Sequence, residues 1–205
     1  MNSLAILPST YFGPIQFYQK LFHYDNCIIE HHENYIKQTY RSRCDIYSPN
    51  GLLTLSVPLI KRNKRQIIKD TKISYEDDWQ LLHWRSIESS YRRSPFFEYY
   101  EDDLRYLFFE KKYTFLIDLN EEAQKQMLEL IQKKITYSFS SEYIVKYENT
   151  DDYREIISPK NHLTTDELFT VKPYNQVFET RYGFIPNLSI LDLLFNQGPK
   201  AADYI

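Results

Sequence analysis

Glycine is scarce in this sequence, with 4 among 205 residues. Loops that bring backbone amides close to a phosphate depend on glycine, because a residue without a side chain permits close approach and positive φ angles. Walker, Rossmann, HExxH and GxSxG motifs are all missing. The sequence therefore excludes the glycine-rich nucleotide loops and carries no catalytic signature of high specificity.

Cysteine and long apolar runs are also lacking. Cys27 and Cys44 are too few for a disulfide framework, and no Cys/His spacing indicates structural zinc, so we expect two reduced, buried thiols. Charged residues interrupt every apolar stretch before about 18 positions, which predicts no membrane span. Residues 1–6 carry neither the basic nor the long apolar region of a secretory signal. We therefore expect a soluble protein of the cytoplasm.

Positive charge is not in excess either. The 25 basic residues against 28 acidic ones give a net charge of −3, which disfavours binding to nucleic acid or to an acidic membrane surface. Aromatic residues, in contrast, are abundant, with 19 Tyr and 13 Phe, and 42% of the chain is hydrophobic. A chain of this length and composition can bury one sizeable core, so we predict a single domain over residues 1–205.

The N-terminal part of the chain predicts the fold class. Residues 4–7 form a short apolar run that is typical of a buried strand, and residues 15–22 have the spacing of an amphipathic helix. Residues 26–30 predict a second buried strand, and a strand-helix-strand start favours a parallel pair. We therefore predict an α/β fold with a mixed, mainly parallel sheet, a β-hairpin and flanking helices, in a Rossmann-like three-layer layout.

A hairpin and several helices are expected further along the chain. The hairpin is predicted for residues 43–47 and 52–59, because Asn50-Gly51 supplies the positive φ angle that a tight turn needs. Residues 67–73 predict another strand. Helices are expected from residue 75 through 91 and over residues 95–109, 116–135 and 188–195. The polar residues 148–170 are interpreted as a long loop or irregular insertion and as a candidate lid.

The carboxyl ends of the first two predicted strands are candidates for a site, because ligands of open α/β sheets gather there. Tyr11 follows the first strand and is a candidate substrate contact. The second strand ends in Glu30-His31-His32-Glu33, where alternation places His31 and Glu33 on one side, so His31 is a candidate acid–base group. Adjacent histidines in a short loop are more often solvent-facing or locally hydrogen-bonded, and we assign no metal site.

Cations follow at alternating positions before and within the hairpin. Tyr35, Lys37 and Arg43, with Arg41 between them, can direct several donors at a phosphate or carboxylate; otherwise they are surface charges. The first three are candidate substrate-binding residues. The basic residues 61–65 are interpreted as a solvated loop, with a phosphate-facing loop as the alternative.

The helix that begins near residue 75 carries Trp79, His83 and Tyr91 at helical spacing. Such a stripe is more often part of a core than of a catalytic site. An unperturbed imidazole nevertheless titrates near neutral pH, so His83 is a candidate general acid–base group if the stripe borders the cleft. Trp79 would then contact the substrate.

Short motifs follow one another along nearly the whole chain. In order they are Leu7-Pro8, Tyr11-Phe12, Phe17-Tyr18, Tyr35-x-Lys37, Tyr40, Arg43, Gly51, Leu55-x-Val57-Pro58, Trp79, His83, Tyr91, Ser94-Pro95-Phe96-Phe97, Tyr174-x-Gln176, Phe184-x-Pro186-Asn187-Leu188-Ser189-Ile190-Leu191-Asp192-Leu193-Leu194-Phe195-Asn196 and Gly198. This pattern resembles the WbqC-like family, and residues 186–196 are its most specific part.

The resemblance implies a bacterial protein linked to the biosynthesis of O-antigen or another surface polysaccharide, with transfer of glycine or another small acyl group to a sugar. In this interpretation Lys37 and Arg43 bind an anionic donor or acceptor, and His83 or His31 moves a proton. The alternative is a non-catalytic binding or assembly protein, whose tyrosines and leucine-rich C-terminal helix form an interface, for example in a homodimer. Neither interpretation names a cofactor.

Overall fold

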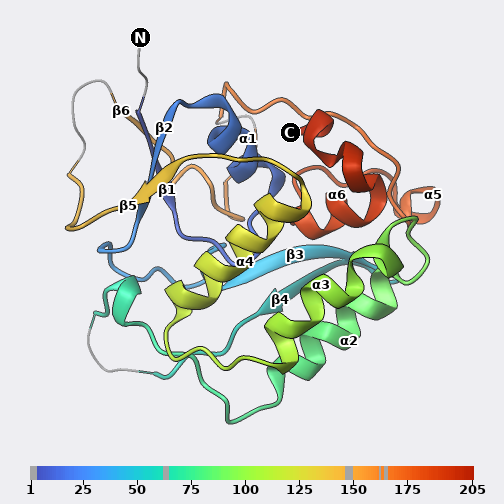
Figure 1. The fold of residues 1–205 in the computed structure, drawn as a ribbon, viewed down its shortest axis with the longest axis horizontal. Helices are drawn as coiled ribbons and strands as arrows, with labels where there is room; N and C mark the ends of the chain where they lie inside the picture. Colours follow the sequence, from blue (N-terminus) through green and yellow to red (C-terminus); the bar gives the residue numbers. More distant parts are fainter. Residues whose placement is uncertain (1–3, 62–64, 146–149, 162, 164–165) are drawn as a thin grey trace.

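A four-stranded parallel sheet is built around the first apolar run of the chain (Figure 1). Its strands are β1 (Leu4–Pro8), β2 (Asn26–Glu30), β5 (Tyr137–Phe139) and β6 (Thr150–Asp152), in the order β5-β2-β1-β6. The structure is a computed structural model that describes residues 4–61, 65–145, 150–161, 163 and 166–205. The predicted mixed α/β class with a mainly parallel sheet is confirmed.

Strands β1 and β2 form the parallel pair that the sequence predicts. Helix α1 (Ile15–His23) connects them, and the pairing runs from Leu4 opposite Asn26 to Pro8 opposite Glu30. Residues 5–7 of β1 are completely buried because the strand is central in the sheet. The two strands end at the same edge, which brings the loops that follow them together.

The predicted hairpin forms a second, two-stranded antiparallel sheet. Strands β3 (Arg43–Ser48) and β4 (Gly51–Ser56) pair from Ser48 opposite Gly51 at the turn to Arg43 opposite Ser56 at the open end. Gly51 has a φ angle of 95°, which explains why the turn requires glycine. The open end of the hairpin, with Arg43, lies next to the segment that follows β2, where the Tyr35 and Ser42 hydroxyls are 2.7 Å apart.

Helices cover the hairpin and the sheet. They are α2 (Trp79–Tyr91), α3 (Phe97–Phe109), α4 (Leu116–Leu130), α5 (Glu179–Tyr182) and α6 (Ile190–Gln197), with the 3-10 helices η1 (Ile68–Asp70) and η3 (Gly198–Tyr204). Helices α2 and α3 pack side by side, and α2 lies along β3 (Figure 1). Helix α6 packs against α1, α3 and β3, so the C-terminal part of the chain closes the core. Among the described residues, no helix has the length and apolar character needed to cross a membrane.

Three expectations are wrong at the level of elements. Within residues 67–73 there is no strand: Ile68–Asp70 form the short helix η1, and isolated bridges join Ile67 to Asn34, Lys72 to Phe115 and Ile73 to Leu59. The helix expected to reach residue 135 ends at Leu130, and Gln132 has a φ angle of 60° that breaks the helical path.

Residues 148–170 are not one long loop. Residues 150–152 form β6, which pairs with β1, and Ile157 is completely buried. Asp166 accepts hydrogen bonds from Lys20 and Gln16 of α1 at 2.8 and 2.7 Å. These contacts anchor the described part of the segment to the core, while residues 148, 149, 162, 164 and 165 lie outside the described residues.

Candidate functional site

A cavity of about 730 Å³ lies at the open end of the hairpin. Three segments contribute to it: the chain that follows β2, the ends of β3 and β4, and the stretch around η1. The lining residues are Tyr35, Lys37, Gln38, Ser42, Arg43, Ser56, Val57, Leu59, Ile60, Lys61, Arg65, Gln66 and Thr71. We call this space the basic cavity.

Backbone hydrogen bonds hold the walls of the basic cavity together. The Tyr35 amide donates to the Gln66 carbonyl, and the Val57 amide donates to the Ser42 carbonyl, both at 2.8 Å. Residues that are far apart in the sequence thus meet through main-chain contacts. The walls are fixed before any ligand arrives, which lowers the cost of ordering them on binding.

The basic cavity is strongly cationic. Lys37, Arg43, Lys61 and Arg65 line it, and its lining contains no Asp or Glu. None of these cations takes part in an ion pair within the described part of the chain. The Nε atom of Arg43 is buried and has no hydrogen-bond partner there. A buried guanidinium nitrogen without an acceptor is unfavourable, and an anion that reached this group would supply the missing acceptor.

The segment after β2 forms a wall between two cavities. Tyr35 and Lys37 line the basic cavity, whereas Asn34 and Ile36 line a neighbouring cavity of about 540 Å³. This alternation is the period of two that an extended chain imposes on its side chains. The wall ends at Gln38, whose φ angle of 61° turns the chain.

Arg41 lies outside the basic cavity, contrary to the alternating series expected from the sequence. Its Nε and Nη2 atoms donate to the two carboxylate oxygens of Glu33 at 2.6 and 2.7 Å, and Nη2 also donates to the Arg154 carbonyl at 3.0 Å. The turn at Gln38 breaks the alternation, which explains the difference. Arg41 is 1% exposed. Its hydrogen bonds to Glu33 join the chain just after the wall to the chain just before it.

Tyr11, His83 and Trp79 form a buried cluster next to the basic cavity. The Tyr11 hydroxyl and His83 Nδ1 lie 3.0 Å apart, and the Trp79 ring meets the imidazole edge-on at 5.0 Å between centroids. Burial lowers the pKa of His83 to about 4, while a hydrogen bond with the backbone of Ser56 acts in the opposite direction. The imidazole is therefore neutral at pH 7. Because Ser56 lines the basic cavity, His83 is connected to the cavity through this residue.

His31 lies in a different environment, at the end of β2. Its ring stacks on Phe139 of β5 with 4.4 Å between centroids. Burial lowers the pKa of His31 to about 4, with a further decrease from His32 and an increase from Glu30. Glu30 accepts a hydrogen bond from Ser140 at 2.6 Å. No group of three or more His, Cys, Asp or Glu side chains suited to a metal ion occurs among the described residues.

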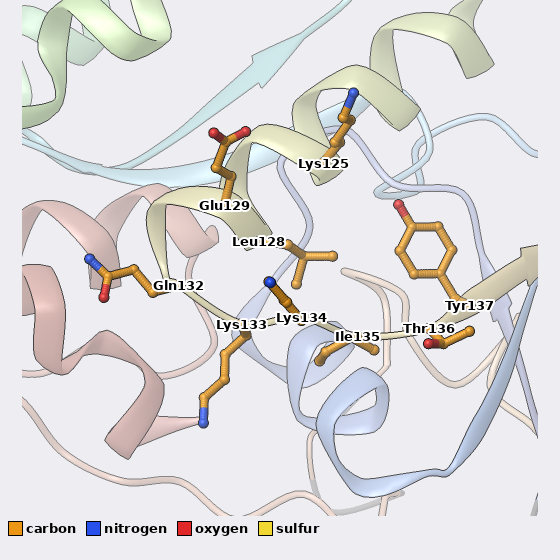
Figure 2. Close-up of a pocket in the computed structure, with 9 residues that line it drawn as sticks. All are labelled: Lys125, Leu128, Glu129, Gln132, Lys133, Lys134, Ile135, Thr136 and Tyr137. Carbon is orange, nitrogen blue, oxygen red and sulfur yellow. The ribbon is translucent and has the colours of Figure 1, made fainter.

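A second lysine-rich cavity, of about 620 Å³, lies at the C-terminal end of α4 (Figure 2). Figure 2 shows the amino groups of Lys125 and Lys133 pointing away from each other, with Glu129 also on the lining. Lys133 lies over the Phe22 ring, 5.9 Å from its centroid. These cations do not converge on one point, so the basic cavity is the stronger candidate for a site.

The structure thus divides the residues predicted from the sequence into three groups. Tyr35, Lys37 and Arg43 share the basic cavity, Tyr11, Trp79 and His83 form the buried cluster behind it, and His31 lies apart. Sequence reasoning missed Ser56, whose role depends on pairing opposite Arg43. Lys61 and Arg65 were visible as part of a basic run; both are exposed and line the cavity, and residues 62–64 lie outside the described residues.

The C-terminal motif has a structural role. Asp192 of α6 is completely buried and accepts hydrogen bonds from the hydroxyls of Tyr91 and Tyr174 at 2.9 and 2.7 Å. Burial raises the pKa of Asp192 to about 6, although these hydrogen bonds act against the increase. Ser189 begins the helix by accepting from the Leu191 amide. These contacts join α6 to α2 and to the chain before it.

Comparison with known proteins gives one family and one uncharacterised relative. The model of the WbqC-like protein family matches residues 9–171, which include every residue that lines the basic cavity. The uncharacterized protein Rv1507c of Mycobacterium tuberculosis is 27% identical over 227 residues, an alignment that covers 100% of this chain and 98% of the relative. No solved structure matches the chain.

Proposed function

The chain belongs to the WbqC-like protein family, and on this premise we propose that it is a transferase of surface-polysaccharide biosynthesis that binds an anionic substrate in the basic cavity. One observation carries the proposal: four cations line one cavity, without an acidic side chain among the lining residues. Charged groups are usually paired when they are brought together, so an unpaired cluster in a concave site favours an anionic ligand.

The proposed reaction transfers glycine or another small acyl group to a sugar. A hydroxyl or amine of the sugar attacks the carbonyl carbon of an activated acyl donor, and a new C–O or C–N bond forms. The bond between that carbon and the donor's leaving group breaks, the leaving group keeps the electron pair, and the sugar's proton passes to a base. Proximity supplies much of the acceleration in such a step.

Each candidate residue has a distinct part in this proposal. Tyr35, Lys37 and Arg43 bind the anionic group because they line the basic cavity. His83 is the proposed proton acceptor, since it is neutral at pH 7 and is connected to the cavity through Ser56. His31 is the second candidate, and separate replacement of the two histidines by Gln distinguishes them. We place the reaction in the cytoplasm, on a single domain.

A thermal-shift screen tests the proposal. The purified protein is heated with nucleotides, nucleotide sugars, amino acids and divalent metals, because a ligand that binds the native state raises the melting temperature by mass action. We expect an anionic compound to raise it in the wild type and to lose this effect in Lys37→Met and Arg43→Met. Lys133→Met, in the cavity at the end of α4, is the matched control and should respond like the wild type.

Two results of the thermal-shift screen would contradict the proposed substrate site. If no compound stabilises the protein, or if the shift survives in Lys37→Met and Arg43→Met, the basic cavity is not a substrate site. The non-catalytic binding or assembly protein then becomes the better interpretation.

A further inference from the structure

We propose that the ligand of the basic cavity carries a diphosphate within a molecule of nucleotide size; this inference rests on the proposed function and specifies its anionic substrate. Four side-chain cations face the cavity. One carboxylate would offset a single positive charge, and a free amino acid would also introduce its own ammonium group. A diphosphate brings two or three negative charges and many acceptor oxygens, which fits four cations better.

The cations differ in depth, and this difference favours an extended anion. Arg43 is half-buried at the open end of the hairpin, and its Nε atom has no partner among the described residues, whereas Lys37, Lys61 and Arg65 are exposed. A guanidinium presents a planar fork that suits a phosphate, and ammonium groups act as mobile point charges. One phosphate on Arg43 and a second nearer the exposed cations would use both kinds of group.

The size of the basic cavity indicates that the ligand is larger than its anionic part. About 730 Å³ is within the range of sites that hold organic molecules of moderate size, roughly 300–1,000 Å³. Val57, Leu59 and Ile60 add an apolar wall beside the cations. Apolar side chains gain nothing from contact with inorganic phosphate, but they can cover the sugar or base of a nucleotide.

A nucleic-acid polymer fits the same observations less well. The whole chain has a net charge of −3, and the four cations line one concave site. A small diphosphate can enter such a cavity, while a long polyanion binds best to cations that continue along the surface. We therefore assign the cavity to a small molecule.

Calorimetric titration of the full chain tests the inference. The probes are the diphosphates UDP, ADP, GDP and CDP, the matching monophosphates, inorganic pyrophosphate, glycine, acetate and a single-stranded RNA oligonucleotide. We expect at least one nucleoside diphosphate to bind tenfold more tightly than its monophosphate and than pyrophosphate. Its affinity should fall at least tenfold in Arg43→Met and remain unchanged in Lys133→Met. Circular dichroism of each variant verifies that it is folded.

The outcomes separate this inference from the proposed function. If glycine or acetate binds as tightly as any diphosphate, and the binding depends on Arg43, the diphosphate inference fails while the anionic-substrate site stands. If the RNA oligonucleotide binds more tightly than every diphosphate, the small-molecule assignment fails. If no anion binds, or if Arg43→Met binds like the wild type, both proposals fail.

Discussion

Arg41 and Arg43 stand two residues apart and have opposite environments. Arg41 is 1% exposed and makes two short hydrogen bonds to Glu33. Arg43 lines the basic cavity, and its Nε atom has no partner among the described residues. The Arg41 guanidinium holds the wall of the cavity, and the Arg43 guanidinium is available to a ligand. Replacement of Arg41 should therefore lower the stability of the fold, and replacement of Arg43 should lower the affinity for the ligand.

Replacement of Arg41 by Met should destabilise the protein, because it leaves the Glu33 carboxylate buried without its cation. Loss of one partner from a buried pair costs about 3–5 kcal/mol. Arg92→Met is the matched control, since Arg92 pairs with Glu88 and Glu101 at the surface and its side chain is 43% exposed. Urea unfolding should show a change of at most about 1 kcal/mol for this control. Equal losses in the two variants would contradict the assigned role of Arg41.

The two buried histidines make stability depend on pH. The pKa of His31 and of His83 is about 4 in the folded protein, below the ordinary value of 6.5, so each contributes stability above pH 6.5 that is lost as pH falls toward 4. Asp192 acts in the opposite direction as the pH falls through 6, because its folded pKa of about 6 exceeds the ordinary 3.8. Between pH 7 and 6 the two histidines together outweigh Asp192, so the free energy of unfolding should fall with pH.

Urea unfolding at pH 7.0 and pH 6.0 measures this dependence. The free energy of unfolding should be lower at pH 6.0, with a limiting slope of about 1.4 kcal/mol per pH unit for each proton taken up on unfolding. His83→Gln should reduce the slope. In NMR titrations the His83 imidazole should have its midpoint near pH 4. A midpoint near 6.5, with an unchanged slope in His83→Gln, would show that His83 is not buried in neutral form.

At the scale of elements, the sequence predicts the parts of the fold whose side chains meet the core. Residues 4–7 and 27–29 are apolar and lie in strands that are largely buried, and the turn at Gly51 follows from its positive φ angle. Strand β6 escapes prediction because its residues, Thr150–Asp152, carry no apolar pattern and pair with β1 through the backbone. Strand β6 depends on pairing with β1, which lies near the N-terminus.

The residues of the candidate site likewise divide into those that a local pattern predicts and those that depend on long-range contacts. The alternation of Tyr35 and Lys37 is a local property, so the sequence could predict that they act together. The separation of Arg41 from them depends on the turn at Gln38, where the φ angle is positive. Glutamine is not a residue type from which a positive φ angle can be predicted. Ser56 joins the site only through strand pairing, which is a long-range contact.

The end of α6 offers a test at this scale. Gly198 has a φ angle of 54°, and a Cβ atom there would lie 2.5 Å from the Phe96 ring. Gly198→Ala should therefore combine backbone strain with a clash and destabilise the protein by about 2–4 kcal/mol. Gly51→Ala is the matched control, because its φ angle is also positive, at 95°, but no atom lies within 4 Å of the added Cβ. Thermal unfolding should show the larger loss for Gly198→Ala; a loss no greater than in Gly51→Ala would exclude the contribution of Phe96.

The whole molecule combines a net negative charge with the basic cavity. The chain carries −3 overall, while the basic cavity has four cations and no acidic lining residue. Fields from exposed charges decay within about 8 Å at physiological salt, so the cavity acts locally. This arrangement suits a small anion that enters the cavity and does not suit a large polyanion.

Arg43 is the central residue of the proposed site, because it is the group that meets the anion, and NMR detection of arginine Nε–H signals tests this role directly. The protein is titrated with inorganic pyrophosphate, and Arg43→Lys and Arg41→Lys assign the two signals. We predict a saturable shift of the Arg43 signal, whose nitrogen has no partner among the described residues, and none of the Arg41 signal, which is already bonded to Glu33. If the Arg43 signal stays in place while amides of residues 125–137 shift, the anion binds at the end of α4 and the assignment of the basic cavity is wrong.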